Sequence, residues 1–300
     1  MVATAVMLAS ALVAAPNIAA ADSDSTVSSS EIASALGNTD RQDGSLVAEP
    51  VPSTTDADSA AITTQAGARL EVPRNPEDGV TLQGDGVPAL SIELPNADES
   101  KDAVRLKDGT VAYPGTDGSA QAVIPTDDGV QMLTTISEAT APTRYAYGVN
   151  VPDGGRVETS PEGAGAVVLD GDGNPVVLVP APWATDANGA AVPSHFETNG
   201  KSLTQVVNHN SGDFVYPVVA DPGFRWKWNG VKVLLSRADM RNVMLSGSQV
   251  LVAMIAIPGV GWVSAAIVAG ISAGSGWAYT NHKCAWAFIG VPSSWGWRDC

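Results

Sequence analysis

Positive charge, histidine and cysteine are scarce in this 300-residue sequence. Its 16 lysines and arginines face 32 aspartates and glutamates, which gives a formal net charge of -16 and argues against nucleic acid as a partner. Only three histidines and two cysteines occur, and His195, His209 and His282 lack the paired spacing that zinc ligands show. We therefore expect no metal and no cofactor.

The motifs of common catalytic sites are missing as well. No G-x-S-x-G sequence places a serine nucleophile on a strained turn, and no glycine-rich loop cradles phosphate. The side chains left for a hydrolytic group are scattered over expected loops: Ser194, His195, His209, Ser211 and Asp213. Exposure to solvent explains these polar residues better than catalysis does, so we expect a protein that is not an enzyme.

A calcium loop is the other site that the sequence suggests. Asp170, Asp172 and Asn174 occupy alternate positions, as the first ligands of an EF-hand loop do. The sixth and twelfth positions of such a loop need glycine and glutamate, but they hold Pro175 and Ala181 here. A hairpin turn therefore explains this stretch better than a calcium site.

The first 66 residues predict an export signal followed by a linker. Residues 1–21 are apolar and end in Ala19-Ala20-Ala21, the small-residue pattern of a signal-peptide cleavage site, although the usual positive start is missing. We expect cleavage after Ala21 and a secreted or cell-surface location. Residues 22–66 are rich in Ser, Thr, Asp and Ala with almost no large apolar side chain, so we expect them to be disordered.

Residues 67–222 carry the pattern of an all-β, sandwich-like body. Short apolar or alternating runs such as VTLQG, AQAVI, VQMLTTI, PVVLV and LTQVV recur there, with no helical periodicity. Tight turns that need a positive φ angle are expected at the pairs between these runs. These pairs are Asp108-Gly109, Asp117-Gly118, Asp128-Gly129, Asp153-Gly154, Asp172-Gly173 and Asn199-Gly200. We expect either one β-rich domain or two modules that divide near Tyr147.

Two stretches of this region resemble a module of exported actinobacterial proteins. They are APWATDANG, which begins at Ala181, and YPVVADP, from Tyr216 to Pro222; the likeness extends over roughly residues 100–222. The resemblance implies export and a helical, glycine-rich tail after the second stretch, but no activity. Within that tail LSRAD, from Leu235 to Asp239, departs from the polar pattern of the family.

The C-terminal region, residues 223–300, reverses the charge of what precedes it. Residues 67–222 hold twenty-two acidic and eight basic side chains, whereas residues 223–300 hold two acidic and seven basic ones. Seven of the eight tryptophans also lie in this region. A cationic, tryptophan-rich end is typical of attraction to an anionic surface.

Two helices are expected in the C-terminal region, packed as a hairpin. Ser236-Arg237-Ala238-Asp239 resembles a capping box with Asp in the place of Glu, and it predicts a helix to about Ile257. Pro258-Gly259 interrupts the pattern, and a second helix fits residues 261–279. Small residues four positions apart on the second helix predict close helix–helix packing. They are Ala266, Gly270, Gly274 and Ala278.

Insertion of residues 242–281 into a membrane is an alternative to this soluble hairpin. No Asp, Glu, Lys or Arg occurs between Arg241 and Lys283, and helices of about 18–20 residues approach the length that spans a bilayer. Trp262 and Trp277 would lie about 22 Å apart along a helix, which suits anchoring at two interfaces. Alanine and glycine predominate over leucine, however, and such helices insert only marginally.

Cys284 and Cys300 predict a disulfide, because an even pair of cysteines in an exported protein pairs most simply with itself. The bond would close a loop of aromatic residues at the end of the chain. We expect tryptophans of this region either to pack on the preceding helices or to contact a membrane or a ligand. These tryptophans are Trp262, Trp277, Trp286, Trp295 and Trp297.

Three functions stay open. In the first, the protein is a non-enzymatic component of the cell surface whose body is a scaffold or binding module for a compact tail. In the second, the tail is membrane-active, as in a pore-forming bacteriocin, and the acidic body keeps it soluble. In the third, the protein hydrolyses an envelope polymer with residues that no motif marks. The partners expected are the cell wall or an anionic membrane surface, and the sequence names no protein partner.

Overall fold

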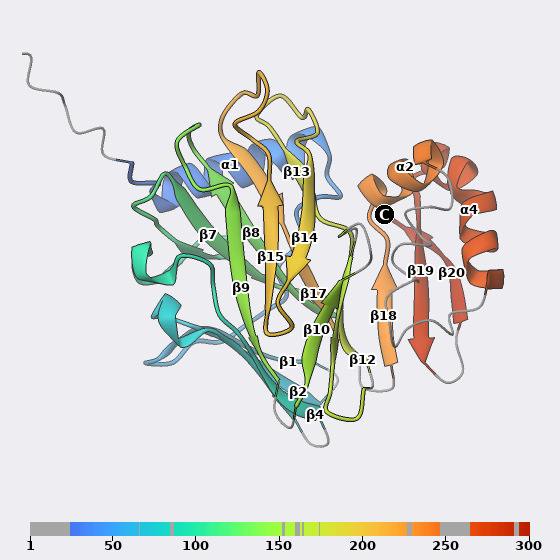
Figure 1. Ribbon diagram of the computed structural model, residues 1–300, viewed down its shortest axis with the longest axis horizontal. Helices are drawn as coiled ribbons and strands as arrows, with labels where there is room; N and C mark the ends of the chain where they lie inside the picture. Colours follow the sequence, from blue (N-terminus) through green and yellow to red (C-terminus); the bar gives the residue numbers. More distant parts are fainter. Residues whose placement is uncertain are drawn as a thin grey trace, which may run out of the picture.

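The computed structural model describes residues 25–65, 67–84, 87–151, 154–159, 163, 165–173, 175–226, 230–246, 265–290 and 294–300. The export signal predicted over residues 1–21 lies outside these residues. Two antiparallel sheets packed face to face form the body of the protein, and a smaller unit of strands and helices lies beside it (Figure 1).

The first sheet of the body has seven strands and the second has ten. In spatial order the first sheet contains β1 (Ser59–Gln65), β2 (Ala68–Pro73), β3 (Val80–Gly84), β4 (Val87–Ile92), β9 (Arg144–Asn150), β15 (Ser202–Val207) and β14 (Ser194–Thr198). The second contains β10 (Arg156–Thr159), β11 (Ala166–Leu169), β12 (Pro175–Val179), β17 (Gly223–Arg225), β8 (Gly129–Ile136), β7 (Ser119–Pro125), β6 (Val111–Tyr113) and β5 (Val104–Arg105). On this sheet β16 (Val218–Asp221) pairs with β8, and β13 (Trp183–Thr185) pairs with β16. Two 3-10 turns, η1 (Pro76–Asp78) and η2 (Ala97–Glu99), complete a body that confirms the expected all-β, sandwich-like class.

One continuous core fills the space between the two sheets. Tyr147 is fully buried in it, and its ring meets that of Phe224 edge-to-face at 5.9 Å. The strand that contains Tyr147, β9, pairs with β4 on one side and with β15 on the other. The alternative of two modules that divide near Tyr147 is therefore wrong, because this strand joins the two halves.

The outer face of the second sheet is covered by helix α1 (Ser29–Gln42) (Figure 1). Three apolar side chains of the helix, Ile32, Ala35 and Leu36, pack against the small residues Ala120 and Ala122 of β7. This contact explains why every residue of β7 is buried. The prediction that residues 22–66 are disordered is wrong for residues 25–65, since three apolar side chains suffice where they meet a flat alanine surface.

A capping box begins α1. The hydroxyl of Ser28 accepts a hydrogen bond from the Glu31 backbone N–H, and the Glu31 carboxylate accepts one from the Ser28 N–H at 2.7 Å. These bonds satisfy two of the donors that a helix N-terminus leaves free. The start of this helix is thus stabilised by side chains from Ser28 to Glu31 alone.

The two stretches that carry the family resemblance are neighbours in the fold. Strand β13, from the APWATDANG stretch, pairs antiparallel with β16, from YPVVADP, so that Trp183 lies opposite Asp221. The Asp186 carboxylate strengthens the link, because it accepts from the backbone N–H groups of Ala190 at 2.8 Å and Val215 at 3.0 Å. Burial alone would raise the pKa of Asp186, but the backbone hydrogen bonds together have the larger effect, and the pKa is lowered.

The stretch that resembles a calcium loop is a hairpin turn between β11 and β12. The Asp170 side chain accepts from the Asp172 N–H at 3.0 Å, and Gly173 has a φ angle of 84°. Glycine suits this position because other residues rarely adopt a positive φ angle. The hairpin interpretation is confirmed.

The smaller unit, called the tail below, comprises residues 230–300. It contains β18 (Gly230–Leu234), α2 (Arg237–Ser246), α4 (Ala265–Thr280), β19 (Lys283–Gly290) and β20 (Ser294–Asp299). The three strands form a sheet in the order β18-β19-β20, and the two helices pack on each other and against that sheet (Figure 1). The tail begins later than the expected boundary at residue 223, because β17 belongs to the second sheet of the body.

Both expected helices of the tail are present in the described residues. The predicted capping box at the start of α2 is confirmed: the Asp239 carboxylate accepts from the Ser236 N–H at 2.6 Å, and the Ser236 hydroxyl accepts from the Asp239 N–H. The second half of the first predicted helix, the break at Pro258-Gly259 and Trp262 lie outside the described residues. Among the helices that the structure describes, none has the length and apolar character needed to cross a membrane.

The end of the chain is a β-hairpin rather than a loop. Strands β19 and β20 pair from Lys283 opposite Asp299 to Phe288 opposite Ser294. The predicted disulfide between Cys284 and Cys300 is confirmed, and it ties the last residue to the start of β19. The alternation of large and small residues in AWAFIG and SWGW is the pattern of such strands, which the expectation of a loop overlooked.

Candidate functional site

The tail packs on the outer face of the second sheet through one buried apolar cluster. The sheet contributes Val167 and Leu169 of β11 and Leu178 of β12. The buried members from the tail are Leu235, Met240, Val243, Ile271, Ala278, Cys284, Ala285 and Ala287. At the edge of the cluster the Arg225 guanidinium, at the end of β17, donates to the Leu234 carbonyl. Body and tail therefore share a core.

The glycine stripe of α4 receives two tryptophans from β20. A methyl group built on Gly270 would come within 2.2 Å of the Trp295 ring, and one on Gly274 within 2.3 Å of the Trp297 ring. The spacings agree, since two residues of a strand span about 6.8 Å and four residues of a helix about 6 Å. The prediction that Gly270 and Gly274 meet another helix is therefore corrected: each glycine makes room for an indole ring.

The rest of the stripe has other surroundings. Ala278 is fully buried and belongs to the cluster shared with α2 and the sheet, in agreement with a packing role. Ala266 lies in the first turn of α4. Two of the four predicted packing residues thus hold a β-hairpin against the helix, which sequence spacing alone does not distinguish from helix–helix packing.

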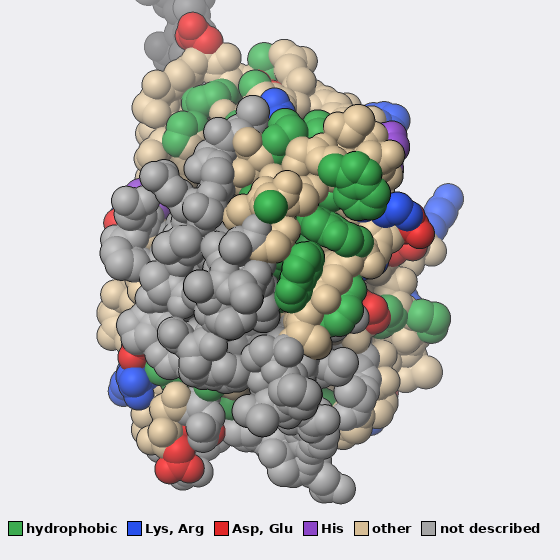
Figure 2. Space-filling view, turned by 90° about the vertical axis from the view of Figure 1, so that its right-hand side faces the viewer, with side chains coloured by type: hydrophobic (Ala, Val, Ile, Leu, Met, Phe, Trp, Pro, Cys, Tyr) green, Lys and Arg blue, Asp and Glu red, His purple; other side chains and the backbone are tan. Residues whose placement is uncertain are grey.

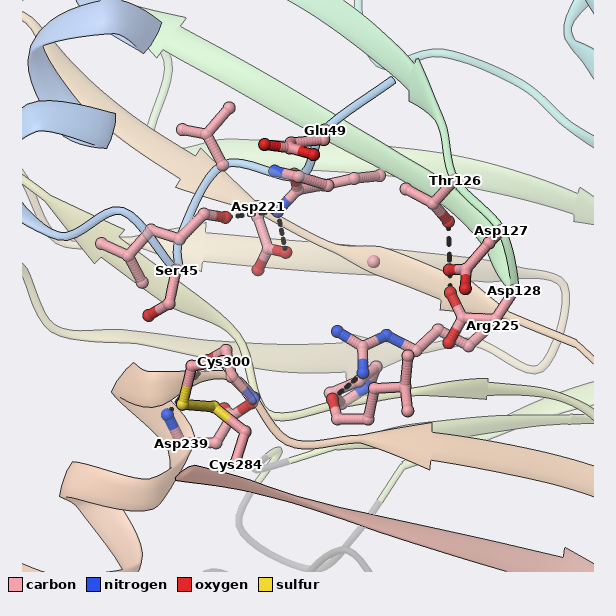
Figure 3. A pocket seen from close by; sticks show the side chains of 18 of the residues that line it. Ser45, Glu49, Thr126, Asp127, Asp128, Asp221, Arg225, Asp239, Cys284 and Cys300 are labelled. Atoms are coloured by element: carbon pink, nitrogen blue, oxygen red, sulfur yellow. Dashed lines mark hydrogen bonds between the residues drawn. A yellow bond between two sulfur atoms is a disulfide. The ribbon is translucent and has the colours of Figure 1, made fainter. Parts of the chain in front are cut away.

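Beside the apolar cluster, a cavity of about 520 Å³ lies between body and tail (Figure 3). One wall is a segment called the strap (residues 44–52), which follows α1. The body lines the cavity with the turn before β8 and the ends of β16 and β17, and the tail with the start of α2 and the disulfide. Its charged side chains are Glu49, Asp127, Asp128, Asp221, Arg225, Asp239 and Arg298.

Gln131 of β8 connects the strap to Asp221 at the floor of the cavity. Its amide nitrogen donates to the Asp221 carboxylate at 3.1 Å and to the Leu46 carbonyl at 2.8 Å, and its oxygen accepts from the Ala48 N–H at 2.8 Å. All the polar atoms of the Gln131 side chain are thus used.

Asp221 and Asp239 are buried carboxyls from opposite sides of the junction, 7% and 6% exposed. Burial raises the pKa of Asp221 to about 7; the Gln131 hydrogen bond opposes the rise, and the neighbouring charge of Asp239 adds to it. Burial also raises the pKa of Asp239, against the charge of Arg225 and hydrogen bonds from the backbone and side chain of Ser236. The two carboxyls at this junction therefore keep their protons to a higher pH than exposed carboxyls do.

Arg225 and Arg298 bring positive charge to the same cavity, from β17 of the body and β20 of the tail. Partial desolvation lowers the pKa of Arg298, although the residue is exposed, and the like charge of Arg225 lowers it further, while Asp128 and Asp127 oppose the shift. The Asp128 carboxylate accepts from the Thr126 hydroxyl at 3.2 Å, which keeps it on the turn before β8. Guanidinium and carboxyl groups thus line the cavity from both body and tail, and the net charge of these groups depends on pH.

The polar residues considered for a hydrolytic or metal site are not brought together. His209 is fully buried: one ring nitrogen lies 2.9 Å from the Tyr216 hydroxyl, and the other lies 3.1 Å from the Pro142 carbonyl. His195 lies on β14 beside Glu197, and His282 follows α4 and contacts Arg237. In the part of the chain that the structure describes, no group of three or more His, Cys, Asp or Glu side chains is arranged to hold a metal.

The predicted contact tryptophans fall into two classes. Trp277 is 55% exposed on α4, whereas Trp286, Trp295 and Trp297 are partly buried within the tail. The Trp297 ring packs edge-to-face against two other indole rings. Its centroid lies 6.0 Å from that of Trp277 and 5.7 Å from that of Trp295. Among the predicted contact tryptophans that the structure describes, Trp277 alone is mostly exposed.

No family model matches the chain, and no curated protein matches it either. The cavity residues were missed at the sequence level for a physical reason. Asp221 lies in the YPVVADP stretch and Asp239 in a capping box, so each had a local explanation, and only the fold places both at one cavity.

Proposed function

We propose that the protein is an exported, non-enzymatic component of the cell surface, in which the β body acts as a scaffold that holds a compact tail. The observation that supports the proposal best is the apolar cluster shared by β11, β12 and the tail. An independent module on a linker would cover its own core, whereas the buried cluster of this tail is continuous with Val167, Leu169 and Leu178 of the body. Export is supported by the apolar start of the chain and by the disulfide.

Cooperative unfolding tests the scaffold. Tryptophan fluorescence reports strongly on the tail, which contains Trp277, Trp286, Trp295 and Trp297, while far-UV circular dichroism reports mainly on the strands of the body. We expect the two urea transitions of the chain lacking residues 1–21 to coincide, because body and tail share a core. A Trp183→Phe variant, which removes one tryptophan of the body, is the control and should leave the midpoints equal. A tail that unfolds at a lower urea concentration than the body would contradict the proposal.

A hydrolase of envelope polymers is the second candidate, because one observation favours it. A carboxyl with a pKa of about 7 in a cavity suits a general acid, and Asp239 supplies a second carboxyl there. Both groups already have structural roles, however: Asp239 caps α2 and Asp221 binds Gln131. We expect no soluble fragments when the protein is incubated with purified cell-wall polymers. Release of fragments that Asp221→Asn abolishes, and that Asp102→Asn at an exposed site leaves intact, would establish the hydrolase instead.

A further inference from the structure

The end of the tail farthest from the body carries an apolar surface, called the tryptophan face below, made of Trp277, Trp295 and Trp297. Figure 1 places α4 on the outer side of the tail, and Figure 2, which looks onto that side, shows hydrophobic side chains gathered there with both basic and acidic side chains beside them. Among the described residues the exposed large hydrophobic side chains of the tail are Trp277 and Met244, at 55% and 39%. Within the described part of the chain, the largest exposed ring thus lies on the tail.

This face is rigid because the glycines of α4 fix its base. The Trp295 and Trp297 rings lie over Gly270 and Gly274, and Trp297 supports Trp277 at 6.0 Å. An indole ring that is already ordered loses little conformational freedom when it binds. Its combination of an apolar ring with one N–H donor suits the headgroup level of a bilayer, where one end is apolar and the other wet.

The net charge of the tail selects the sign of the partner. Arg237 of α2 stands over the Tyr279 ring at 5.2 Å, on a different side of α4 from Trp277, and Arg241 is exposed one turn after Arg237. The tail, residues 230–300, holds five basic and two acidic side chains, whereas residues 67–222 hold eight basic and twenty-two acidic ones. An anionic surface therefore attracts the tail and repels the body, which orients the protein with its tail toward that surface.

We propose that the folded tail docks on the surface of an anionic phospholipid bilayer, with Trp277 at the headgroup level and the basic side chains of α2 near the phosphates. The inference rests on the proposed function, because the body must hold the tail folded while it binds. Docking is peripheral: none of the helices that the structure describes is long and apolar enough to cross, and the apolar side chains of α2 and α4 in the shared cluster stay packed on the sheet. This mode differs from the pore-forming alternative, in which the tail leaves the body and inserts.

The test uses the chain lacking residues 1–21 and sucrose-loaded vesicles of phosphatidylglycerol and phosphatidylcholine, with phosphatidylcholine vesicles for comparison. We expect sedimentation with the anionic vesicles only, and about tenfold weaker binding of Trp277→Ala, since the exposed part of the ring is lost to the interface. Arg241→Gln should weaken binding a few-fold, as one cation near an anionic surface does. Val215→Ala, at a 45% exposed site on the body, is the control and should bind like the parent chain.

Several outcomes would overturn the docking. The parent chain, Trp277→Ala and Trp277→Phe must first show the same urea midpoint, so that all three are equally stable. Equal vesicle binding by Trp277→Ala and the parent chain then excludes the tryptophan face. Release of a trapped dye from the vesicles indicates insertion and favours the membrane-active alternative. Binding to purified anionic wall polymer but not to vesicles assigns the face to the wall. If the protein does not bind the anionic vesicles but its unfolding transitions coincide, the docking alone is refuted. Unfolding transitions that do not coincide refute the scaffold.

Discussion

Replacing Gly274 with alanine is expected to lower the free energy of unfolding by about 1–2 kcal/mol, although alanine is the better helix former. In an exposed helix the substitution gains up to about 1 kcal/mol, because glycine loses more backbone freedom on folding. At Gly274 the new methyl group would come within 2.3 Å of the Trp297 ring. That ring is held between Trp277 and Trp295, so it cannot move away without disturbing the whole tryptophan face.

Gly276 provides the matched control for this prediction. It lies two residues farther along α4, and a methyl group built on it meets nothing within 4 Å. We expect Gly276→Ala to raise the free energy of unfolding by about 0.5–1 kcal/mol, the opposite sign for the same chemical change in the same helix. Urea titrations followed by tryptophan fluorescence measure both. Two stabilised variants would mean that the indole rings do not occupy the glycine stripe.

Turns and caps were predictable from the sequence because each depends on a few neighbouring residues. Asp172-Gly173 forms its hairpin and Ser236 caps its helix, and in both places the side chains that stabilise the feature lie within four residues. The strands of the body were predictable for a similar reason, since burial of a strand face imposes its own alternation. Ser28 and Glu31 carry an equally local signal for α1. The prediction of disorder relied instead on the average composition of residues 22–66. An average composition says little about a helix that buries only three apolar side chains.

Features that depend on partners distant in sequence were not predictable. The small residues from Ala266 to Ala278 predict that another element packs closely on this helix. A strand with a Trp-x-Trp sequence and a second helix both need small residues at nearly this spacing. The cavity is a stronger example, because its residues come from as far apart as Glu49 and Arg298. Pairing of β16 and β17 with β8 and docking of the tail bring them together, and no local pattern encodes either event.

Asp221 is expected to make the protein less stable as the pH rises from 5 to 8. Its pKa is about 7 in the folded protein, against an ordinary value of 3.8, so the folded state binds the proton more tightly than the unfolded state does. The stability that comes from this proton is complete below about pH 4 and is lost as the pH rises through 7. Relative to the parent, Asp221→Asn should therefore gain about 2–3 kcal/mol in free energy of unfolding between pH 5 and pH 8.

The groups around Asp221 decide how far this effect extends. Asp239 faces it from α2, and its own raised pKa adds to the loss of stability in the parent, while Arg225 opposes the rise in both carboxyls. Urea titrations at pH 5, 6, 7 and 8 measure the change, with Asp186→Asn as the control. The pKa of Asp186 is lowered by its backbone hydrogen bonds despite burial, so its stabilisation is lost only under acid conditions. The Asp186→Asn curve should run parallel to that of the parent over this range, and a parallel curve for Asp221→Asn would show that the junction holds no proton.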